Sequence, residues 1–162
     1  MKNIRIEIKW GIIFTIVMML WTLLERLLGW HDVHIDKHAY YTLIFILPAF
    51  IMYYFALVEK RETDYAGQMN WSQGFRSGII IGIVVALLSP LSQYITQTFI
   101  SPHYFDNVIE YSVKSGTYET TEAAAEYFNL TNYIVQSMIF AVVTGAFTAA
   151  IVAIFTKKKY AN

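Results

Sequence analysis

Four long apolar stretches dominate the hydrophobic pattern of the chain, and polar connections separate them. The stretches cover residues 10–30, 39–58, 75–100 and 132–156. Each has about 20 residues or more, which is the length that an α-helix needs to cross the hydrocarbon core of a bilayer. The pattern therefore predicts an all-α integral membrane protein in which residues 1–162 form a single domain of four transmembrane helices.

Small and polar residues recur at regular spacings inside these stretches. The first stretch carries such a seam at alternating steps of four and three residues, made of Gly11, Thr15, Met18, Thr22, Glu25 and Gly29. The third and fourth stretches carry small residues at every fourth position, namely Gly74, Gly78, Gly82, Ser137, Ala141, Gly145 and Ala149. Because small residues let helix backbones approach closely within lipid, we expect these faces to pack against other helices of the protein.

A few strongly polar side chains interrupt the predicted helices. Glu25 and Arg26 lie near the end of the first helix, and Gln93 and Gln97 lie in the second half of the third. Arg26 can extend its guanidinium toward lipid headgroups, whereas Glu25 belongs to the seam and should face the bundle. Two roles stay open for Glu25: a proton or ligand contact, or a buried hydrogen bond to Gln93, Gln97 or a hydroxyl of the third or fourth helix.

Lysine and arginine are distributed unevenly between the two ends of the predicted helices. One side holds both termini and the connection between the second and third helices, and it carries Lys2, Arg5, Lys9, Lys60, Arg61, Arg76, Lys157, Lys158 and Lys159. The other side carries only Lys37 and Lys114. By the positive-inside rule, both termini are predicted to be cytoplasmic.

The longest connection, residues 101–131, has helical patterns of its own. YFDNVIEYSV spaces apolar residues as a helix does, and TTEAAAEYF predicts a second short helix with Thr120 or Thr121 at its N-cap. Acidic residues outnumber the single Lys114 in this connection. We expect a short amphipathic cap outside the membrane that covers helix ends, with a docking surface as the other interpretation.

Three of the four histidines, His31, His34 and His38, fall between the first and second helices, and His103 is predicted on the same side. Neutral imidazole commonly binds zinc, copper or nickel, so a metal site completed by His103 or Asp36 is one interpretation. The spacing matches no zinc signature. We therefore favour an interfacial turn in which Asp36 caps the second helix, and we expect no bound metal or cofactor.

Composition agrees with a membrane protein. Apolar residues make up 56% of the chain and charged residues 15%, which is too apolar for an ordinary soluble domain. The formal net charge is zero, so nothing indicates binding to nucleic acid. The chain has no cysteine, and no catalytic motif or phosphate-binding glycine loop is present, so we expect no enzymatic activity.

Three segments together resemble a known family. GQMNWSQGFRSG leads into the third helix, ISPHYF leaves it, and AIVAIFTKKK closes the chain. In this order, within four apolar helices, they are similar to the bacterial membrane family catalogued as domain of unknown function 4199, from about Lys9 to Lys158. The resemblance implies the bacterial inner membrane as the location, and it implies no activity, ligand or catalytic residue.

The leading hypothesis from the sequence is a non-enzymatic accessory subunit or assembly partner in the lipid bilayer. Its helix faces would bind a protein partner or a second copy of the chain. The alternative is a small oligomeric transporter or channel with a polar path along Glu25, Gln93 and Gln97.

Overall fold

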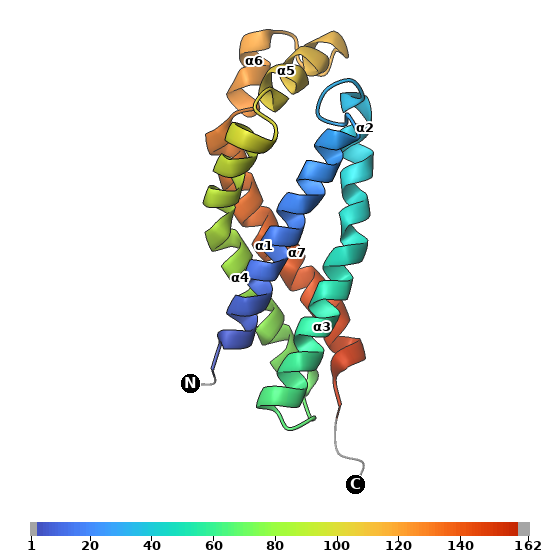
Figure 1. Ribbon diagram of the computed structural model, residues 1–162, viewed down its shortest axis with the longest axis vertical. Coiled ribbons are helices and arrows are strands. Elements are labelled where there is room, and N and C mark those ends of the chain that lie inside the picture. Colours follow the sequence, from blue (N-terminus) through green and yellow to red (C-terminus); the bar gives the residue numbers. More distant parts are fainter. Residues whose placement is uncertain (1–2, 159–162) are drawn as a thin grey trace. The chain divides into compact units, whose positions relative to one another are not determined.

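The structure is a computed structural model that describes residues 3–158 (Figure 1). Four helical spans are long and apolar enough to cross a membrane, namely Arg5–Leu27, Ile35–Asp64, Trp71–Ile100 and Leu130–Thr156. This confirms the predicted all-helical class and the number of candidate spans. Among the described residues, Met69 and Lys158 form an isolated antiparallel β-bridge outside the helices. Lys2 and Lys159, which contributed to the predicted orientation, lie outside the described residues.

Helix α1 spans Arg5–Leu27 and ends before the predicted boundary at Trp30. Gly29 has a positive φ of 75°, which a residue without Cβ adopts readily. The amide of Trp30 donates to the carbonyl of Glu25, and the amide of Gly29 donates to that of Arg26. This pair of bonds is a Schellman motif, which closes a helix and turns the chain away from it.

The second span consists of three consecutive helical segments. These are α2 (Ile35–Tyr41), a 3₁₀ segment η1 (Thr42–Phe45) and α3 (Ile46–Asp64). Pro48 lies in the first turn of α3. A proline there lacks an amide hydrogen and crowds the carbonyl four residues earlier, at Ile44, which accounts for the tighter 3₁₀ segment just before α3.

The third span is helix α4 (Trp71–Ile95) followed by a π-helical segment η2 (Thr96–Ile100). Asn70 caps α4, since its side-chain oxygen accepts from the amide of Gln73 and the side chain of Gln73 accepts from the amide of Asn70. This is the reciprocal arrangement of a capping box. Pro90 lies inside α4, and the last turns of the span are wound more loosely, as η2.

Two short helices separate the third span from the fourth, α7 (Leu130–Thr156). Helix α5 covers Tyr104–Lys114 and α6 covers Thr121–Tyr127. Gly116, with a φ of 76°, lies between them, and Thr120 is the N-cap of α6, with its hydroxyl accepting from the amide of Ala123.

The described chain falls into two compact units, each with its own contacts. Unit 1 contains residues 3–16, Ile46–Leu88 and residues 138–158, and unit 2 contains Val17–Phe45 and Ser89–Ser137. The core of unit 1 is an apolar cluster made of Tyr53, Ala56, Leu57, Met69, Ile81, Ala149, Val152 and Ala153.

Helices α4 and α7 make backbone-to-backbone contact in unit 1. A methyl group added at Gly82 would lie 3.0 Å from the carbonyl oxygen of Ala141, and one at Gly145 would lie 3.0 Å from the Cα of Gly82. At Gly78 an added methyl group would overlap Ala149, and at Gly74 it would lie 3.2 Å from the Cβ of Ala153. The predicted small-residue faces are therefore in contact here, with Ser137 outside this unit and bonded to the carbonyl of Tyr133 in its own helix.

The outer faces of the spans carry large apolar side chains. Leu20 on α1, Leu87 on α4 and Phe147 on α7 are each more than half exposed, at 58%, 69% and 62%. Large apolar side chains that stay exposed on several long spans fit helices that face lipid. Together with the length of the spans, these faces indicate a multi-pass membrane protein.

Candidate functional site

Three ionisable side chains of unit 2 converge in its interior. Glu25, His31 and His38 each present one ligand atom, and these atoms all lie within 4.8 Å of one another. Glu25 is 2% exposed and His31 is 4% exposed, while His38 is partly buried. We call these three residues the Glu–His cluster.

The end of α1 and the start of α2 bring the cluster together. Glu25 is in the last full turn of α1, and the Schellman motif at Gly29 reverses the chain directly after it. The amide of His34 then donates to the carbonyl of Gly29, which tightens the turn and leaves His34 at the N-cap position of α2. As a result the rings of His31 and His38 meet edge to face, with centroids 5.0 Å apart.

Glu25 has partners on α1 itself and on the following turn. One carboxylate oxygen, Oε1, accepts from the indole Nε1 of Trp21 at 2.8 Å. The other, Oε2, lies 3.5 Å from Nε2 of His31. The partners proposed from the sequence, Gln93 and Gln97, are partly buried on the third span, and Oε1 of Gln97 is buried with no hydrogen-bond partner in residues 3–158.

His31 is held from two sides by the segment that follows the third span. Its Nδ1 lies 2.9 Å from the hydroxyl of Ser101, and its backbone carbonyl accepts from the side-chain amide of Asn107. Ser101 is positioned by the π-helical segment, since its amide donates to the carbonyl of Thr96. Segments of π-helix occur frequently at functional sites.

Tyr104 covers the two imidazoles. Its ring centroid lies 5.1 Å from that of His31 and 5.4 Å from that of His38. Its hydroxyl lies 3.1 Å from the hydroxyl of Tyr133, and burial raises the pKa of the Tyr104 phenol above its ordinary value. The aromatic ring shields the cluster from water, which strengthens electrostatic interactions within it.

The remaining residues of the predicted metal site lie apart from the cluster. His34 and Asp36 are exposed, and the side chain of His103 is 81% exposed and 3.8 Å from Asp106. Among the residues that the structure describes, the group with metal-ligand spacing contains Glu25 instead of these three. The prediction that Asp36 caps the second helix is wrong, because α2 has no side-chain cap and Asp36 lies inside its first turn.

Arg26 points away from this site. It is exposed in the last turn of α1, next to the buried Glu25. Adjacent residues on a helix point about 100° apart, so burial of one and exposure of the other follow from helix geometry.

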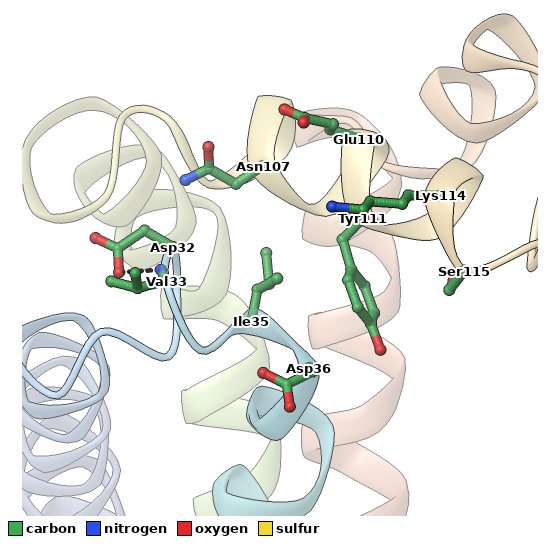
Figure 2. Close-up of a pocket in the computed structure, with 9 residues that line it drawn as sticks. All are labelled: Asp32, Val33, Ile35, Asp36, Asn107, Glu110, Tyr111, Lys114 and Ser115. Carbon is green, nitrogen blue, oxygen red and sulfur yellow. Dashed lines mark hydrogen bonds between the residues drawn. The ribbon is translucent and has the colours of Figure 1, made fainter.

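Unit 2 also has an open groove of about 550 Å³ (Figure 2). Its lining comes from the turn before α2, from α2 and from α5, and comprises Asp32, Val33, Ile35, Asp36, Asn107, Glu110, Tyr111, Lys114 and Ser115. In Figure 2, Tyr111 reaches from α5 toward the side of α2 that carries Asp36. Three carboxylates against one ammonium give the groove an excess of negative charge.

A second buried polar cluster lies in unit 1. The ammonium of Lys60, 3% exposed, lies 2.8 Å from Oε1 of Glu7 and 2.6 Å from Oδ2 of Asp64. The hydroxyl of Ser77 donates to Glu7 at 2.7 Å. Sequence reasoning missed this network because it counted Lys60 as a residue of a cytoplasmic connection; the four-residue spacing of Lys60 and Asp64 was the available signal.

The sequence analysis did not place Glu25 with the histidines, and it did not identify the other neighbours of the Glu–His cluster. Ser101, Asn107 and Tyr104 were missed as its neighbours, and only the four-residue spacing of Trp21 and Glu25 indicated a contact in advance. Chemically, a carboxylate and two imidazoles can share protons or bind a metal ion.

Comparison with known proteins identifies the family of the chain. No curated protein and no solved structure matches the chain. The model of the family described as "Protein of unknown function (DUF4199)" matches residues 9–158, which is most of the chain. This confirms the resemblance seen in the sequence. The chain therefore belongs to the DUF4199 family.

Proposed function

We propose that the protein is a non-enzymatic accessory subunit or assembly partner of the bacterial inner membrane. It would cross the membrane four times with both termini in the cytoplasm. The exposed apolar faces of the spans would contact lipid and a protein partner or a second copy of the chain.

The close packing inside unit 1 is the observation that carries this proposal. A methyl group added at Gly145 would lie 2.7 Å from the hydroxyl of Tyr53 and 3.0 Å from the Cα of Gly82. Space that cannot hold a methyl group cannot hold a hydrated ion or a solute. The packing therefore favours a rigid structural element over a monomer with a conduit along these helices.

The positive charge of the predicted cytoplasmic side supports the orientation. Arg5 and Arg76 are exposed, and Lys9 is paired with Glu59 at 2.5 Å. The connections on the predicted outer side carry only Lys37 and Lys114. An excess of lysine and arginine on the cytoplasmic side is what the positive-inside rule describes.

A transporter is the second candidate, and one observation favours it. Gln97 has a buried side-chain oxygen without a hydrogen-bond partner in the described residues, in the same unit as Glu25. Buried polar groups without partners are rare in folded proteins and often belong to a functional site.

Two measurements separate the candidates. Purified protein in liposomes should not raise proton, sodium or potassium flux above that of empty liposomes if the protein is an accessory subunit. In cells, a photo-crosslinking residue at the exposed position Phe147 should yield one defined adduct, whereas the same residue at the buried position Ala149 should yield none. The accessory role would be rejected if wild-type protein raised the flux, the Glu25→Gln variant did not, and no defined adduct formed at Phe147.

A further inference from the structure

We propose that Glu25, His31 and His38 bind a divalent first-row transition-metal ion, with zinc as the expected occupant. The inference goes beyond the accessory role and does not depend on it. Two imidazoles and one carboxylate are a recurrent protein ligand set for zinc, in which a fourth position is left to water or another ligand. Mixed nitrogen and oxygen donors of this kind suit zinc, iron, copper or nickel better than magnesium or calcium.

The separations of the donor atoms fit such an ion. With metal–ligand bonds of 2.0–2.1 Å, donors of a tetrahedral zinc site lie about 3.3 Å apart. Oε2 of Glu25 and Nε2 of His31 lie 3.5 Å apart already. All three ligand atoms lie within 4.8 Å of one another, so each remaining donor–donor separation has to shorten by at most about 1.5 Å for the His38 nitrogen to complete the set.

Two of the ligands are already oriented by neighbouring groups. The hydroxyl of Ser101 lies 2.9 Å from Nδ1 of His31, which leaves Nε2 directed at Glu25. The indole of Trp21 donates to Oε1 of Glu25 at 2.8 Å and leaves Oε2 toward the imidazole. Partners that hold the far side of a ligand in this way are a regular feature of metal sites.

His38 provides a second, independent observation that points to a bound ion. Its Nδ1 is buried and has no hydrogen-bond partner in residues 3–158. An ion pair between Glu25 and His31 would satisfy those two groups but would assign no partner to His38. A metal ion bound to one ring nitrogen of His38 explains why a second imidazole is held in the interior next to a carboxylate.

Residues that line the acidic groove are linked to the cluster through the chain and through one hydrogen bond. Asp32 follows His31 in the chain, Asp36 lies on α2 with His38, and Asn107 donates to the carbonyl of His31. The carboxylates that line the groove raise the local concentration of cations next to the cluster.

The test is a titration with cobalt(II), which reports tetrahedral coordination through its visible absorption, followed by competition with zinc. The full chain is purified with an affinity tag that contains no histidine, stripped with a chelator and kept in mild detergent. We expect saturation at one cobalt ion per chain, and full displacement by one equivalent of zinc. His31→Ala and His38→Ala should each weaken binding by at least about 100-fold, and Ser101→Ala by about 10-fold.

His34→Ala and His103→Ala serve as matched controls, since both residues are exposed histidines outside the cluster. They should change the affinity by less than the 10-fold expected for Ser101→Ala. Thermal unfolding identifies any ligand variant that no longer folds. If one does not fold, the cobalt affinity of Ser101→Ala, which keeps all three ligands, serves as the test instead. The proposal is overturned if the wild-type protein shows no saturable binding, if folded His38→Ala binds as tightly as wild type, or if only the exposed histidines affect binding.

Discussion

Replacing Lys60 by methionine should strongly destabilise the protein. The ammonium of Lys60 is the only cation among the contacts of the unit 1 network described above, where it faces both Glu7 and Asp64 and also donates to the carbonyl of Asn3 at 2.8 Å. Methionine keeps the apolar part of the side chain and removes the charge. The carboxylate of Glu7, 1% exposed, would then keep only the hydroxyl of Ser77.

The magnitude follows from the burial of both partners. Removing one partner of a buried ion pair costs about 3–5 kcal/mol, because it leaves an uncompensated charge in a medium of low dielectric constant. For a chain of this size, that corresponds to a fall in Tm of about 6–20 °C. The assay is thermal unfolding of the purified protein in detergent, followed by near-UV circular dichroism.

A control and a rescue sharpen the Lys60 prediction. Lys9 pairs with Glu59, but its side chain is 48% exposed, so Lys9→Met should cost only about 0–1 kcal/mol. The double variant Glu7→Leu/Lys60→Met removes both charges of the more deeply buried pair and should recover most of the lost stability. The reasoning is refuted if Lys60→Met and Lys9→Met have equal effects, or if the double variant is less stable than Lys60→Met.

Three further predictions concern packing, orientation and alkaline pH. Gly82→Leu should destabilise the protein by about 1–3 kcal/mol or more and so lower Tm, because the Cβ of the new side chain would lie 3.0 Å from the carbonyl oxygen of Ala141. The neighbouring Ile83→Leu, at a 42% exposed position, is the control, and equal Tm values for the two variants would count against the contact. Thr63→Cys and Lys114→Cys, in a chain without cysteine, should react with an impermeant thiol reagent from opposite sides of the membrane, and labelling of Thr63→Cys in intact cells would reverse the orientation. Burial raises the pKa of Tyr104 above the unfolded value of about 10, so the contribution of this residue to the free energy of unfolding is lost as pH rises past about 10. Tyr104→Phe should therefore show a smaller fall in the free energy of unfolding above pH about 10 than wild type. An equal fall in the two proteins would contradict this prediction.

The helical class and the spans were predictable because they depend on local periodicity. Spans of about 20 apolar residues are read directly from the sequence. The seam on the first span likewise includes Thr15 and Glu25, which the structure buries at 7% and 2% exposure. Periodicity indicates which face of a helix points inward, but it does not indicate which other helix that face contacts.

The partners of the buried polar groups were not predictable in the same way. Glu25 meets His31 only because Gly29 adopts a positive φ and ends α1 with a Schellman motif, whereas the sequence analysis extended the helix to Trp30. A continued helix would have placed His31 on another turn, away from the carboxylate. Ser101 reaches His31 across a separation of 70 residues, through a π-helical segment that has no pattern in the sequence.

The metal proposal is tested most directly by X-ray absorption at the zinc edge, on protein prepared from cells grown with zinc and purified without a histidine tag. The account predicts one zinc ion per chain, with scattering from two imidazole rings and oxygen as the remaining atoms bound to zinc, and loss of that signal in His38→Ala. Less than a tenth of an equivalent of zinc, or zinc whose spectrum shows no imidazole and is unchanged in His38→Ala, would contradict it.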